Sequence, residues 1–539
     1  MNLLLVNPRK RPHKDERDVF DFRYVTKFLG KQGTAGLALA LPTVAGLTPK
    51  GVDIEIVDEN WQTIDFDADC DVVGITAMTL QSIRAYEIAD EFRARGKTVI
   101  LGGMHPSTLP SEAAKHADCV VAGEIEDIWA DVVEDYRQGR LQPFYRAPGF
   151  PDLVKTPFAR RDLIANEHYM GDLVQSSRGC PFDCDFCSIQ KFLGQKMRFK
   201  ENEQFIRELR HIYEFSGRSP YQKVLVVTDD NFYGAPARTK SLLKDMIKLN
   251  REMPISGWFC QCTMNVAQDD ECLELLAEAG CKNIELGIES LSDANLVDGI
   301  GKRINKVDAY SWTIERIRNA GMDAVCSFIF GGENDTPKVF ENTVRFIEDN
   351  HIITAVLNIA TPLPGTDYFT KMEREGRILH KDWSLFDTQH CVIKPKGMSE
   401  RELEEGYIWA NKEIFSLPSL SKKLQHHTGR MYHEIGKFDL LRAKANFTAN
   451  LLAKTGRIGA EHFKWAVGLI PYIFRPDVDV QLPTIVVCLD HNDFSRQLEK
   501  THADYLRTLS TERPPMDKET AEAIFAAPLP PPSTEAMVA

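Results

Sequence analysis

The chain has 539 residues, of which 43% are hydrophobic and 27% charged, a composition typical of a folded protein with about two to four domains. Its 65 Lys and Arg residues against 78 Asp and Glu residues give a net charge of −13, which excludes long-range attraction to nucleic acid phosphates. No apolar run approaches the roughly 20 residues that cross a bilayer, and the N-terminus does not resemble a signal peptide. We therefore expect a cytoplasmic protein without a transmembrane segment or a nucleic acid partner.

The first 140 residues alternate short apolar runs with stretches of helical periodicity. Strands are predicted at "NLLLV", "DIEIV", "DVVGIT", "KTVILGG" and "DCVVAG", and helices at 79–95 and 125–138. Buried strands that alternate with helices are typical of an α/β fold with a parallel, doubly wound, Rossmann-like sheet, whose ligands bind at the carboxyl ends of the strands. Residues 141–170 contain four prolines, and we expect a linker there.

A second alternation of strands and helices begins near residue 171. The predicted strands are "DLVQSS", "KVLVVTDD", "GWFCQC", "NIELGIES", "AVCSFIFGG" and "ITAVLNIATP", with helices between them near 201–214, 236–250, 269–279, 306–320 and 337–349. Six parallel strands indicate a partial (β/α)6 barrel over residues 171–370, in which the loops after the strands carry the chemistry. We expect residues 371–525 to form a mainly helical domain and the Pro-rich residues 526–539 to be disordered.

Three cysteines follow the first of these barrel strands. Cys180, Cys184 and Cys187 lie in "CPFDCDFC" with the spacing C-x3-C-x2-C, whereas the other nine cysteines are scattered and are expected to be small core residues. A structural zinc site has four ligands, so zinc would need a distant fourth Cys or His. An iron-sulfur cluster can instead be held by three thiolates, which leaves one iron open for another ligand.

This octapeptide resembles the cysteine signature of the radical S-adenosylmethionine (SAM) enzymes, with Phe186 at the aromatic position, and the resemblance extends from 172 to about 365. It implies that the three cysteines hold a 4Fe-4S cluster whose open iron binds the amino and carboxylate groups of SAM. An electron from the cluster then yields methionine and a 5′-deoxyadenosyl radical, which abstracts hydrogen from unactivated carbon. The resemblance also implies contacts to SAM from residues that follow later strands: Asp229 or Asp230, Glu289, Gly331 and Gly332. As alternatives, the carboxylates are solvated or capping groups and the glycines form a turn.

The first 140 residues resemble the cobalamin (B12)-binding domain that precedes many radical SAM enzymes. The order and spacing of several phrases carry the resemblance: "LLLVNP", "GTAGLALALP" (33–42), "IEIVDEN", "DVVGITAMTLQSI", "VILGGMHPSTLPSEA" and "VVAGEIEDIW". By resemblance, the residues near the corrin are Thr76, Met78 and Thr79. Those along the cleft for its nucleotide tail are Gly102, Gly103, Gly123 and Glu124.

One element of the related cobalamin domains is missing. The D-x-H-x-x-G motif that supplies a histidine to cobalt in methionine-synthase-like domains is absent, and we assign His105 in "GMHPS" a turn or loop role. The domain is expected to bind cobalamin without a protein histidine on cobalt. The alternative is a degenerate domain that keeps the fold without the cofactor.

Residues from about 366 to 475 resemble the helical C-terminal extension on the branch of these enzymes that includes hopanoid-modifying enzymes. The stretch "HFKWAVGLIPYIF" (462–474) is either a lipid-facing stripe or, as is more usual for an amphipathic stretch, part of a core. We expect this region to select the substrate and to exclude water. Removal of the residues from about 380 onward is then expected to spare cofactor binding and abolish turnover.

Together these features predict a cobalamin-dependent radical SAM enzyme, a methyltransferase that acts on an unactivated carbon. One SAM would generate the radical, and methylcobalamin, recharged by a second SAM, would deliver the methyl group. Two alternatives stay open: an enzyme that cyclises, oxidises or rearranges its substrate without methyl transfer, and a non-catalytic cobalamin or iron-sulfur sensor. The expected partners are a small-molecule substrate, with lipids among the candidates, and a reducing protein such as flavodoxin or ferredoxin.

Overall fold

The computed structural model describes residues 1–11, 39–164, 169, 172–215, 224–253, 257–414, 419 and 423. The chain divides into two compact units, and every helix and strand named below belongs to the unit formed by Met1–Asp15, Leu37–Asn166 and Gly171–Ile414. Most of the predicted helical domain, the stretch 462–474 and the predicted tail 526–539 lie outside the described residues. No helix in the described ranges is long and apolar enough to cross a membrane.

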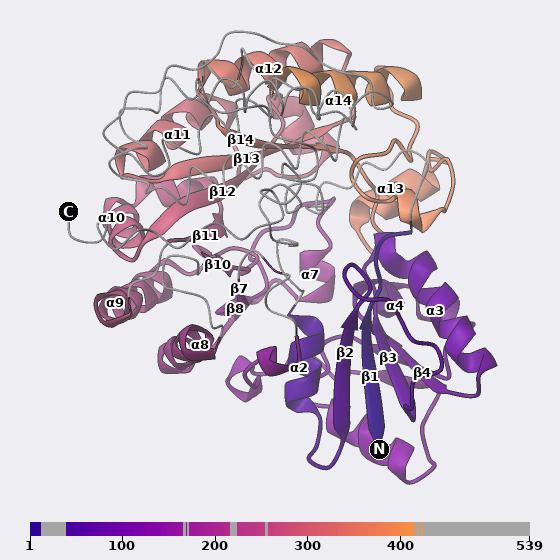
Figure 1. Ribbon diagram of the computed structural model, residues 1–539. Helices are drawn as coiled ribbons and strands as arrows, with labels where there is room; N and C mark the ends of the chain where they lie inside the picture. The colour runs from indigo at the N-terminus through magenta and orange to yellow at the C-terminus, as the bar shows by residue number, and fades with distance from the viewer. Residues whose placement is uncertain are drawn as a thin grey trace, which may run out of the picture. The chain divides into compact units, whose positions relative to one another are not determined.

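The N-terminal part of this unit is a parallel sheet with the strand order β2-β1-β3-β4-β5-β6 (Figure 1). Its strands are β1 (Asn2–Asn7), β2 (Asp53–Asp58), β3 (Val72–Thr76), β4 (Thr98–Gly102), β5 (Cys119–Ala122) and β6 (Phe144–Arg146). The order reverses between β1 and β3, and such a reversal marks the ligand crevice of a doubly wound sheet. The predicted fold class is confirmed for this part of the chain.

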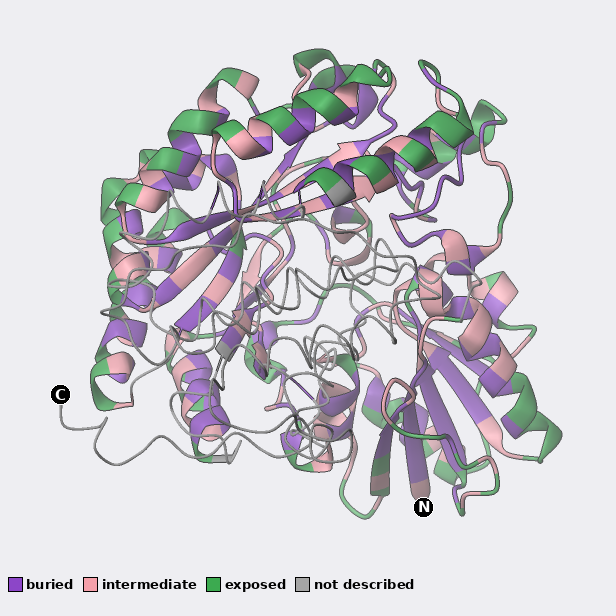
Figure 2. Cartoon of the chain, turned by 45° about the horizontal axis from the view of Figure 1, so that its top comes forward, coloured by how far each residue is buried: buried purple, intermediate pink, exposed green. Residues whose placement is uncertain are grey.

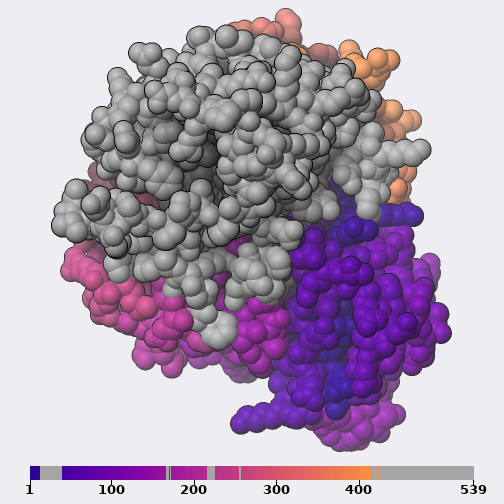
Figure 3. Space-filling model, viewed as in Figure 1, coloured from indigo at the N-terminus to yellow at the C-terminus, as the bar shows by residue number. Residues whose placement is uncertain are grey.

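Helices cover the N-terminal sheet, and its strands are accordingly apolar on both faces. Every residue from Leu3 to Val6 of β1 is buried. The helices are α2 (Ala40–Leu47), α3 (Ser82–Ala94), α4 (Met104–Thr108), α5 (Pro110–Ala113) and α6 (Trp129–Arg137). Figure 2 shows the strands of this sheet as mostly buried, and Figure 3 shows the same domain, in indigo to purple, with its side chains in place.

Strand β6 lies inside the stretch that the sequence predicts as the linker 141–170. Its three residues pair in parallel with β5, and Phe144 and Arg146 are exposed. A short, exposed edge strand between prolines has no alternation of buried and exposed positions long enough to recognise. The linker prediction is therefore wrong at this strand.

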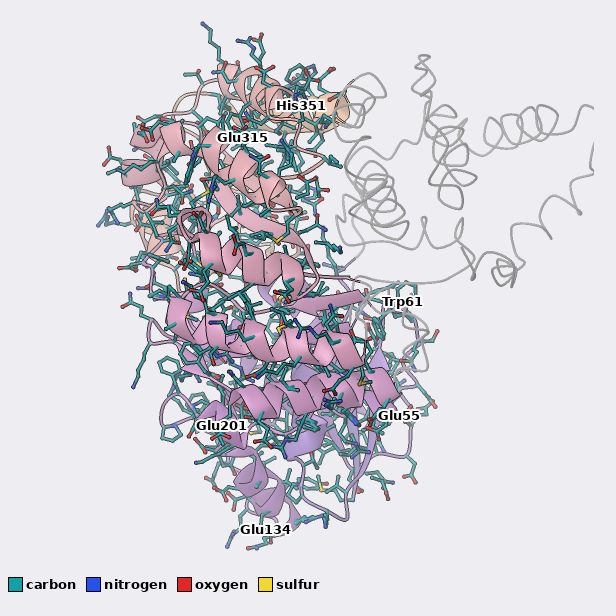
Figure 4. The ribbon with its side chains drawn as sticks, turned by 90° about the vertical axis from the view of Figure 1, so that its left-hand side faces the viewer. Glu55, Trp61, Glu134, Glu201, Glu315 and His351 are labelled. Atoms are coloured by element: carbon teal, nitrogen blue, oxygen red, sulfur yellow. The ribbon has the colours of Figure 1, made fainter. Side chains whose placement is uncertain are left out.

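The second sheet is the predicted partial barrel, with six parallel strands in the order β14-β13-β12-β11-β10-β7. The strands are β7 (Asp172–Val174), β10 (Val224–Val227), β11 (Gly257–Cys262), β12 (Cys281–Glu289), β13 (Asp323–Phe330) and β14 (Thr354–Ile359). The helices between them are α8 (Asn202–Phe215), α9 (Pro236–Glu252), α10 (Asp270–Glu278), α11 (Tyr310–Asn319) and α12 (Lys338–Asp349). Figure 4 looks onto these helices, with Glu315 of α11 on their exposed side.

Residues alternate between buried and partly exposed along the later barrel strands. In β13, Cys326 and Phe328 are buried, whereas Ser327 and Ile329 are partly exposed. Because neighbouring residues of a strand point to opposite faces, and helices cover one face, the partly exposed set lines the barrel interior. Strands β7 and β14 are the two edges, which do not pair with each other within the described residues. The described strands therefore form a partial barrel rather than a closed one.

Elements that follow the barrel complete its core. They are α13 (Asp367–Arg374), a helical turn at Trp383–Leu385 and α14 (Glu400–Ile414). A Cβ on Gly331, at the end of β13, would lie 2.9 Å from Leu403 Cδ2 of α14. The packed unit thus extends to Ile414 rather than to the predicted core boundary at 370.

Candidate functional site

The three clustered cysteines lie on one irregular loop, residues 179–197, after the first barrel strand. The ends of this cysteine loop are joined by the antiparallel pair β8 (Ser177–Arg178) and β9 (Arg198–Phe199), and the short helix α7 (Ile189–Phe192) lies within it. Gly179 has a φ of +93°, and a Cβ there would lie 2.9 Å from the carbonyl oxygens of Gly194 and Lys196. The loop therefore requires glycine directly before Cys180.

Cys180, Cys184 and Cys187 are partly exposed, whereas the other described cysteines are buried. Burial raises the pKa of all three thiols, that of Cys184 to about 12; Cys180 and Cys187 act electrostatically on Cys184, and Cys180 acts on Cys187. Within the described ranges, no three His, Cys, Asp or Glu side chains lie close enough to share one metal ion. Three neighbouring thiols suit a 4Fe-4S cluster, in which each sulfur binds a different iron, whereas a structural zinc ion would need a fourth ligand.

A buried pair of opposite charges lies beside these cysteines. Lys302 Nζ donates to Glu289 Oε1 at 2.7 Å, and the Lys302 amine interacts electrostatically with Cys184 and Cys187. Burial lowers the pKa of Lys302, but Glu289 and the thiols of Cys184 and Cys187 together raise it, so that the net shift favours the ammonium form. Glu289 has a φ of +64° at an irregularity in the pairing of β12 with β13, and Ser327 Oγ donates to its Oε2 at 3.2 Å. A non-glycine residue in this backbone conformation is strained, which is common at binding sites.

The two aspartates that follow β10 have different roles. Asp229 is buried, and its carboxylate accepts hydrogen bonds from Ser176 N, Ser176 Oγ and Ser177 Oγ, each at 2.6 Å. These bonds tie the end of β7 to β10. Asp230 accepts one bond, from Gly179 N at 2.9 Å, and burial raises its pKa to about 6, with a further contribution from Asp229. Asp230 is therefore the aspartate that contacts the cysteine loop.

The two glycines after β13 are engaged by a carboxylate. Gly331 and Gly332 donate their amide N–H groups to Asp335 Oδ2 at 3.0 and 2.8 Å, and Asn295 Nδ2 donates to Asp335 Oδ1 at 2.6 Å. Burial raises the pKa of Asp335 to about 6, although these donors lower it. Gly331 has a φ of +90°. The backbone conformation and the packing against α14 explain why residue 331 is a glycine. The amide N–H groups of Gly331 and Gly332 both bind Asp335 and are not available to a ligand.

Phe186, between the second and third cysteines, packs against a buried cluster after β14. The cluster consists of Ala360, Tyr368, Phe369, Met372, Trp383, Phe386, Val392 and Ile393. Ile83 and Leu109 of the N-terminal sheet domain pack against the same cluster. The segment 382–393 therefore joins the cysteine loop to the sheet domain.

Two of the three residues predicted near the corrin lie at the accessible edge of the N-terminal sheet. Thr76 ends β3 and is partly buried, and Met78 is 51% exposed. Thr79 is buried instead, and its Oγ1 lies 3.4 Å from His105 Nδ1. This edge adjoins the reversal of strand order between β1 and β3, so Met78 presents a large apolar side chain beside the expected crevice.

The glycines predicted along the cleft follow β4 and β5. Gly102 ends β4, and a Cβ there would meet only Val121 O, at an ordinary 3.6 Å. Gly103 has a φ of +96°, and a Cβ there would lie 2.7 Å from Thr76 Oγ1. Gly123 has a φ of +93° and donates its N–H to Ser107 Oγ at 2.9 Å. Gly103 and Gly123 therefore meet a conformational requirement, whereas Gly102 does not.

His105 is not in a turn or loop as predicted, but in the short helix α4, where it is fully buried. Its Nε2 lies 3.2 Å from Glu112 Oε1, and its Nδ1 faces Thr79. Glu112 Oε1 also accepts hydrogen bonds from Tyr86 OH at 3.1 Å and Trp383 Nε1 at 3.0 Å. Both ring nitrogens of His105 therefore face partners inside the protein.

Sequence patterns missed the polar groups that reach the cysteine loop from a distance. Lys302 lies in "GIGKRIN", after the fourth barrel strand, in a stretch without clear periodicity. Glu124 was expected at the nucleotide tail, but its carboxylate binds Arg178 and Arg198, at the two ends of the cysteine loop. A glutamate two residues after β5 carries no local signal for such a partner.

Comparisons with known proteins agree with this geometry. The radical SAM superfamily model matches residues 174–347, and the B12 binding domain model matches residues 28–133. Bacteriochlorophyllide d C-8(2)-methyltransferase of Chlorobaculum tepidum is 34% identical over 368 residues, which cover 66% of this chain and 80% of that protein. The hopanoid C-2 methylase of Rhodopseudomonas palustris is 28% identical over 365 residues, which cover 66% of this chain and 67% of that protein.

A solved structure supports the fold. The cobalamin-dependent SAM radical enzyme OxsB, with aqua-cobalamin and SAM bound, has a TM-score of 0.60 and 13% sequence identity, over 97% of this chain and 83% of that chain. At this identity the likeness concerns the arrangement of helices and strands. It agrees with a doubly wound sheet followed by a partial barrel in one chain.

Proposed function

The chain belongs to the radical SAM superfamily enzymes that carry a B12 binding domain, and from this premise we propose that it methylates an unactivated carbon of a large polycyclic molecule. It is an enzyme that acts on a small molecule and uses SAM, a 4Fe-4S cluster and cobalamin. The cysteine loop is the observation that carries the proposal. Its three partly exposed thiols lie beside the Lys302–Glu289 pair of the partial barrel.

We assign the cluster to Cys180, Cys184 and Cys187, because they are the partly exposed thiols of the described chain. When bound, the cluster and cobalamin supply reductive cleavage of SAM, hydrogen abstraction from carbon and delivery of the methyl group. The protein provides the remaining requirements, which are orientation of the reactants and exclusion of water. Phe186 helps to orient the cysteine loop, because it packs against the buried apolar side chains around Trp383.

Charge complementarity supports the residues that would bind SAM. The Lys302 ammonium suits the carboxylate of SAM, and Asp230, beside the cysteine loop, suits its amino group. Glu289 holds Lys302 in place. Asp229 is occupied by Ser176 and Ser177, so we assign it to the joint between β7 and β10. Gly331 and Gly332 remain candidates for contact with the adenosine of SAM. They would not use their amide N–H groups, which donate to Asp335.

The carboxyl edge of the N-terminal sheet is the proposed cobalamin site. Thr76 and the exposed Met78 suit the corrin, because a broad ring system binds mainly through apolar contact. Gly102, Gly103 and Gly123 let the backbone come close to the nucleotide tail. Thr79 is buried, so it would affect the cobalamin site only indirectly, through its contact with His105.

The substrate class comes from the relatives, which are named for bacteriochlorophyllide d and for hopanoids. Both are ring systems, one a tetrapyrrole and the other a lipid. Reductive cleavage of SAM needs a strong electron donor, so a flavodoxin or ferredoxin and a cytoplasmic location are the matching expectations.

Methyl transfer is tested with SAM that carries an isotopic label in its methyl group. Anaerobically reconstituted protein, reduced with dithionite, is incubated with unmethylated bacteriochlorophyllide d or with an unmethylated hopanoid. We expect label in the product, together with 5′-deoxyadenosine and S-adenosylhomocysteine. The Cys184→Ala protein should form neither the labelled product nor 5′-deoxyadenosine. Mass spectrometry of the product and of both nucleosides is the measurement.

Other outcomes select the alternatives. A changed but unlabelled product with 5′-deoxyadenosine would indicate cyclisation, oxidation or rearrangement. No 5′-deoxyadenosine under any condition, from protein that holds both cofactors, would favour a sensor. Abortive formation of 5′-deoxyadenosine without a product would reject these two substrates and keep the enzyme.

A further inference from the structure

The two strands that close the cysteine loop place two arginines opposite each other. In the antiparallel pair β8–β9, Arg178 is the direct partner of Arg198. Their side chains are only 14% and 12% exposed. Like charges directly opposite on neighbouring strands destabilise the pair, and poor solvation increases the cost. The base of the loop therefore needs negative charge.

The N-terminal sheet domain supplies this charge through Glu124. Its Oε2 accepts hydrogen bonds from Arg178 Nη1 at 2.5 Å and from Arg198 Nη1 at 3.0 Å, and its Oε1 accepts one from Arg198 Nη2 at 2.6 Å. The Glu124 side chain is 3% exposed. One buried carboxylate thus bridges the residues that directly precede and follow the loop.

Further contacts hold the same groups in place. Arg198 Nη2 also donates to Leu193 O at 2.8 Å, inside the cysteine loop, and Arg198 lies 4.9 Å from the ring centre of Phe150. Arg178 Nη1 also donates to Glu126 Oε1 at 2.6 Å. Glu126 touches only one of the two arginines, whereas Glu124 touches both. Of these two glutamates, Glu124 is therefore the one that links both ends of the loop.

We propose that Glu124 is a positioning residue through which the N-terminal sheet domain holds the cysteine loop closed around the cluster. The same carboxylate joins the two domains and the two ends of the loop, so docking and closure occur together. This role replaces the predicted one at the nucleotide tail, because both carboxylate oxygens already bind guanidinium groups. The proposal rests on the proposed function for the identity of the cluster ligands, but the exposure of the thiols can be measured without any cofactor.

The test compares Glu124→Gln with Glu126→Gln. The second substitution also removes one negative charge, from a glutamate that contacts Arg178 but not Arg198 in the described residues. In cofactor-free protein, the rate of N-ethylmaleimide modification is measured for each cysteine by peptide mass spectrometry. In the Glu124→Gln protein we expect N-ethylmaleimide to react with Cys180, Cys184 and Cys187 faster by about tenfold or more, because the two arginines are left buried without their shared carboxylate. The Glu126→Gln protein should show a smaller increase in these rates. The buried Cys119 and Cys391 report global unfolding and should stay unmodified.

Two further measurements separate positioning from folding and from corrin binding. Adding Arg198→Gln to Glu124→Gln removes the second guanidinium, and we expect the modification rates to return toward those of the Arg198→Gln single variant. In reconstituted protein, the electron paramagnetic resonance spectrum of the reduced cluster is recorded with and without SAM. We expect an altered spectrum in Glu124→Gln and an unaltered one in Glu126→Gln.

Equal modification rates in the two glutamine variants, or additive effects in the double variant, would overturn the proposal. So would a Glu124→Gln protein that loses corrin while its thiol rates and cluster spectrum stay unchanged, because that result would return Glu124 to the nucleotide tail. Loss of methyl transfer with faster thiol modification supports positioning. Failure of the proposed function alone would leave the thiol result intact.

Discussion

Cys184 is the central cysteine of the motif, and burial raises the pKa of its thiol to about 12. We predict that Cys184→Ala abolishes cluster assembly, because radical initiation uses three thiolates and one open iron, which leaves no spare ligand. Iron content and visible charge-transfer absorbance after anaerobic reconstitution are the measurements. Cys272→Ala, at a buried cysteine of α10, is the matched control and should retain the cluster. A complete cluster in Cys184→Ala would contradict the assignment.

His105 has both ring nitrogens directed at partners within the protein, Thr79 and Glu112. We predict that His105→Ala leaves the absorbance spectrum of bound hydroxocobalamin unaltered, since an imidazole that does not reach cobalt cannot change its axial ligation. The measurement uses full-length protein after removal of free corrin. A spectral shift in folded protein would mean that His105 reaches cobalt.

The segment 382–393 is an irregular stretch that contacts the N-terminal sheet domain at two polar points. Trp383 Nε1 donates to Glu112, and Lys10, just beyond β1, forms an ion pair with the buried Asp387. Thr388 has a φ of +64°, a strained conformation for a β-branched residue. Packing on both sides stabilises this stretch, which has no helix or strand of its own beyond one turn.

Docking of this segment should depend on the ionisation of Glu112. The hydrogen bond with His105 lowers the pKa of Glu112 below its ordinary 4.5, against the opposing effect of burial, and Tyr86 and Trp383 lower it further. A carboxylate with a lowered pKa stabilises the docked form above pH 4.5, and this contribution is lost as the pH falls through the lower, folded-state pKa. We predict that amide hydrogen exchange of 382–393, corrected for its intrinsic pH dependence, accelerates below about pH 4.5.

Glu112→Gln is the control for that pH step. Its exchange in 382–393 should be faster than in the wild type at neutral pH and should show no additional acceleration across the same acid range. An equal acid step in the variant would assign the effect to other carboxylates, such as Asp387.

Elements were predictable where burial imposed a period on the sequence. The longer barrel strands β11–β14 and the helices α8–α12 follow their predicted ranges closely, because each has a repeated buried face. Strands β6, β8 and β9 have two or three residues each, too few to show a period. The sequence therefore did not predict the β8–β9 pair at the ends of the cysteine loop, although the spacing of the cysteines did indicate the loop itself.

The end of the packed unit at Ile414 alters the expected effect of truncation. We predict that a chain of residues 1–414 retains corrin, cluster and abortive SAM cleavage but loses substrate turnover. A chain that ends at 379 should aggregate, because it lacks Trp383, Phe386 and Leu403, which cover apolar surface of the barrel and the sheet domain. Solubility, iron content, corrin content and product formation are the measurements. Full turnover by residues 1–414 would show that the remainder is not needed for the reaction.

Contacts between distant parts of the chain set the limit of sequence reasoning for the site. The proposed ligand motif is local, so Cys180, Cys184 and Cys187 could be proposed as cluster ligands from spacing alone. Lys302 reaches the cysteine loop from more than 100 residues away, and Glu124 reaches it from the other domain. Neither contact leaves a periodic signal, because a single ion pair constrains only the two residues that form it.

The bond between Trp383 and Glu112 joins residues that are 271 positions apart. At about 5 to 20 residues per second, a ribosome needs roughly 15 to 50 s to add the later residue after the earlier one. All strands of the N-terminal sheet emerge before that time. Until the segment 382–393 is synthesised, the apolar surface around Ile83 and Leu109 therefore stays without its cover. During this interval the growing chain is a natural client for chaperones, and substitutions that delay the arrival or docking of 382–393 should lower the yield of native protein more than its stability once folded.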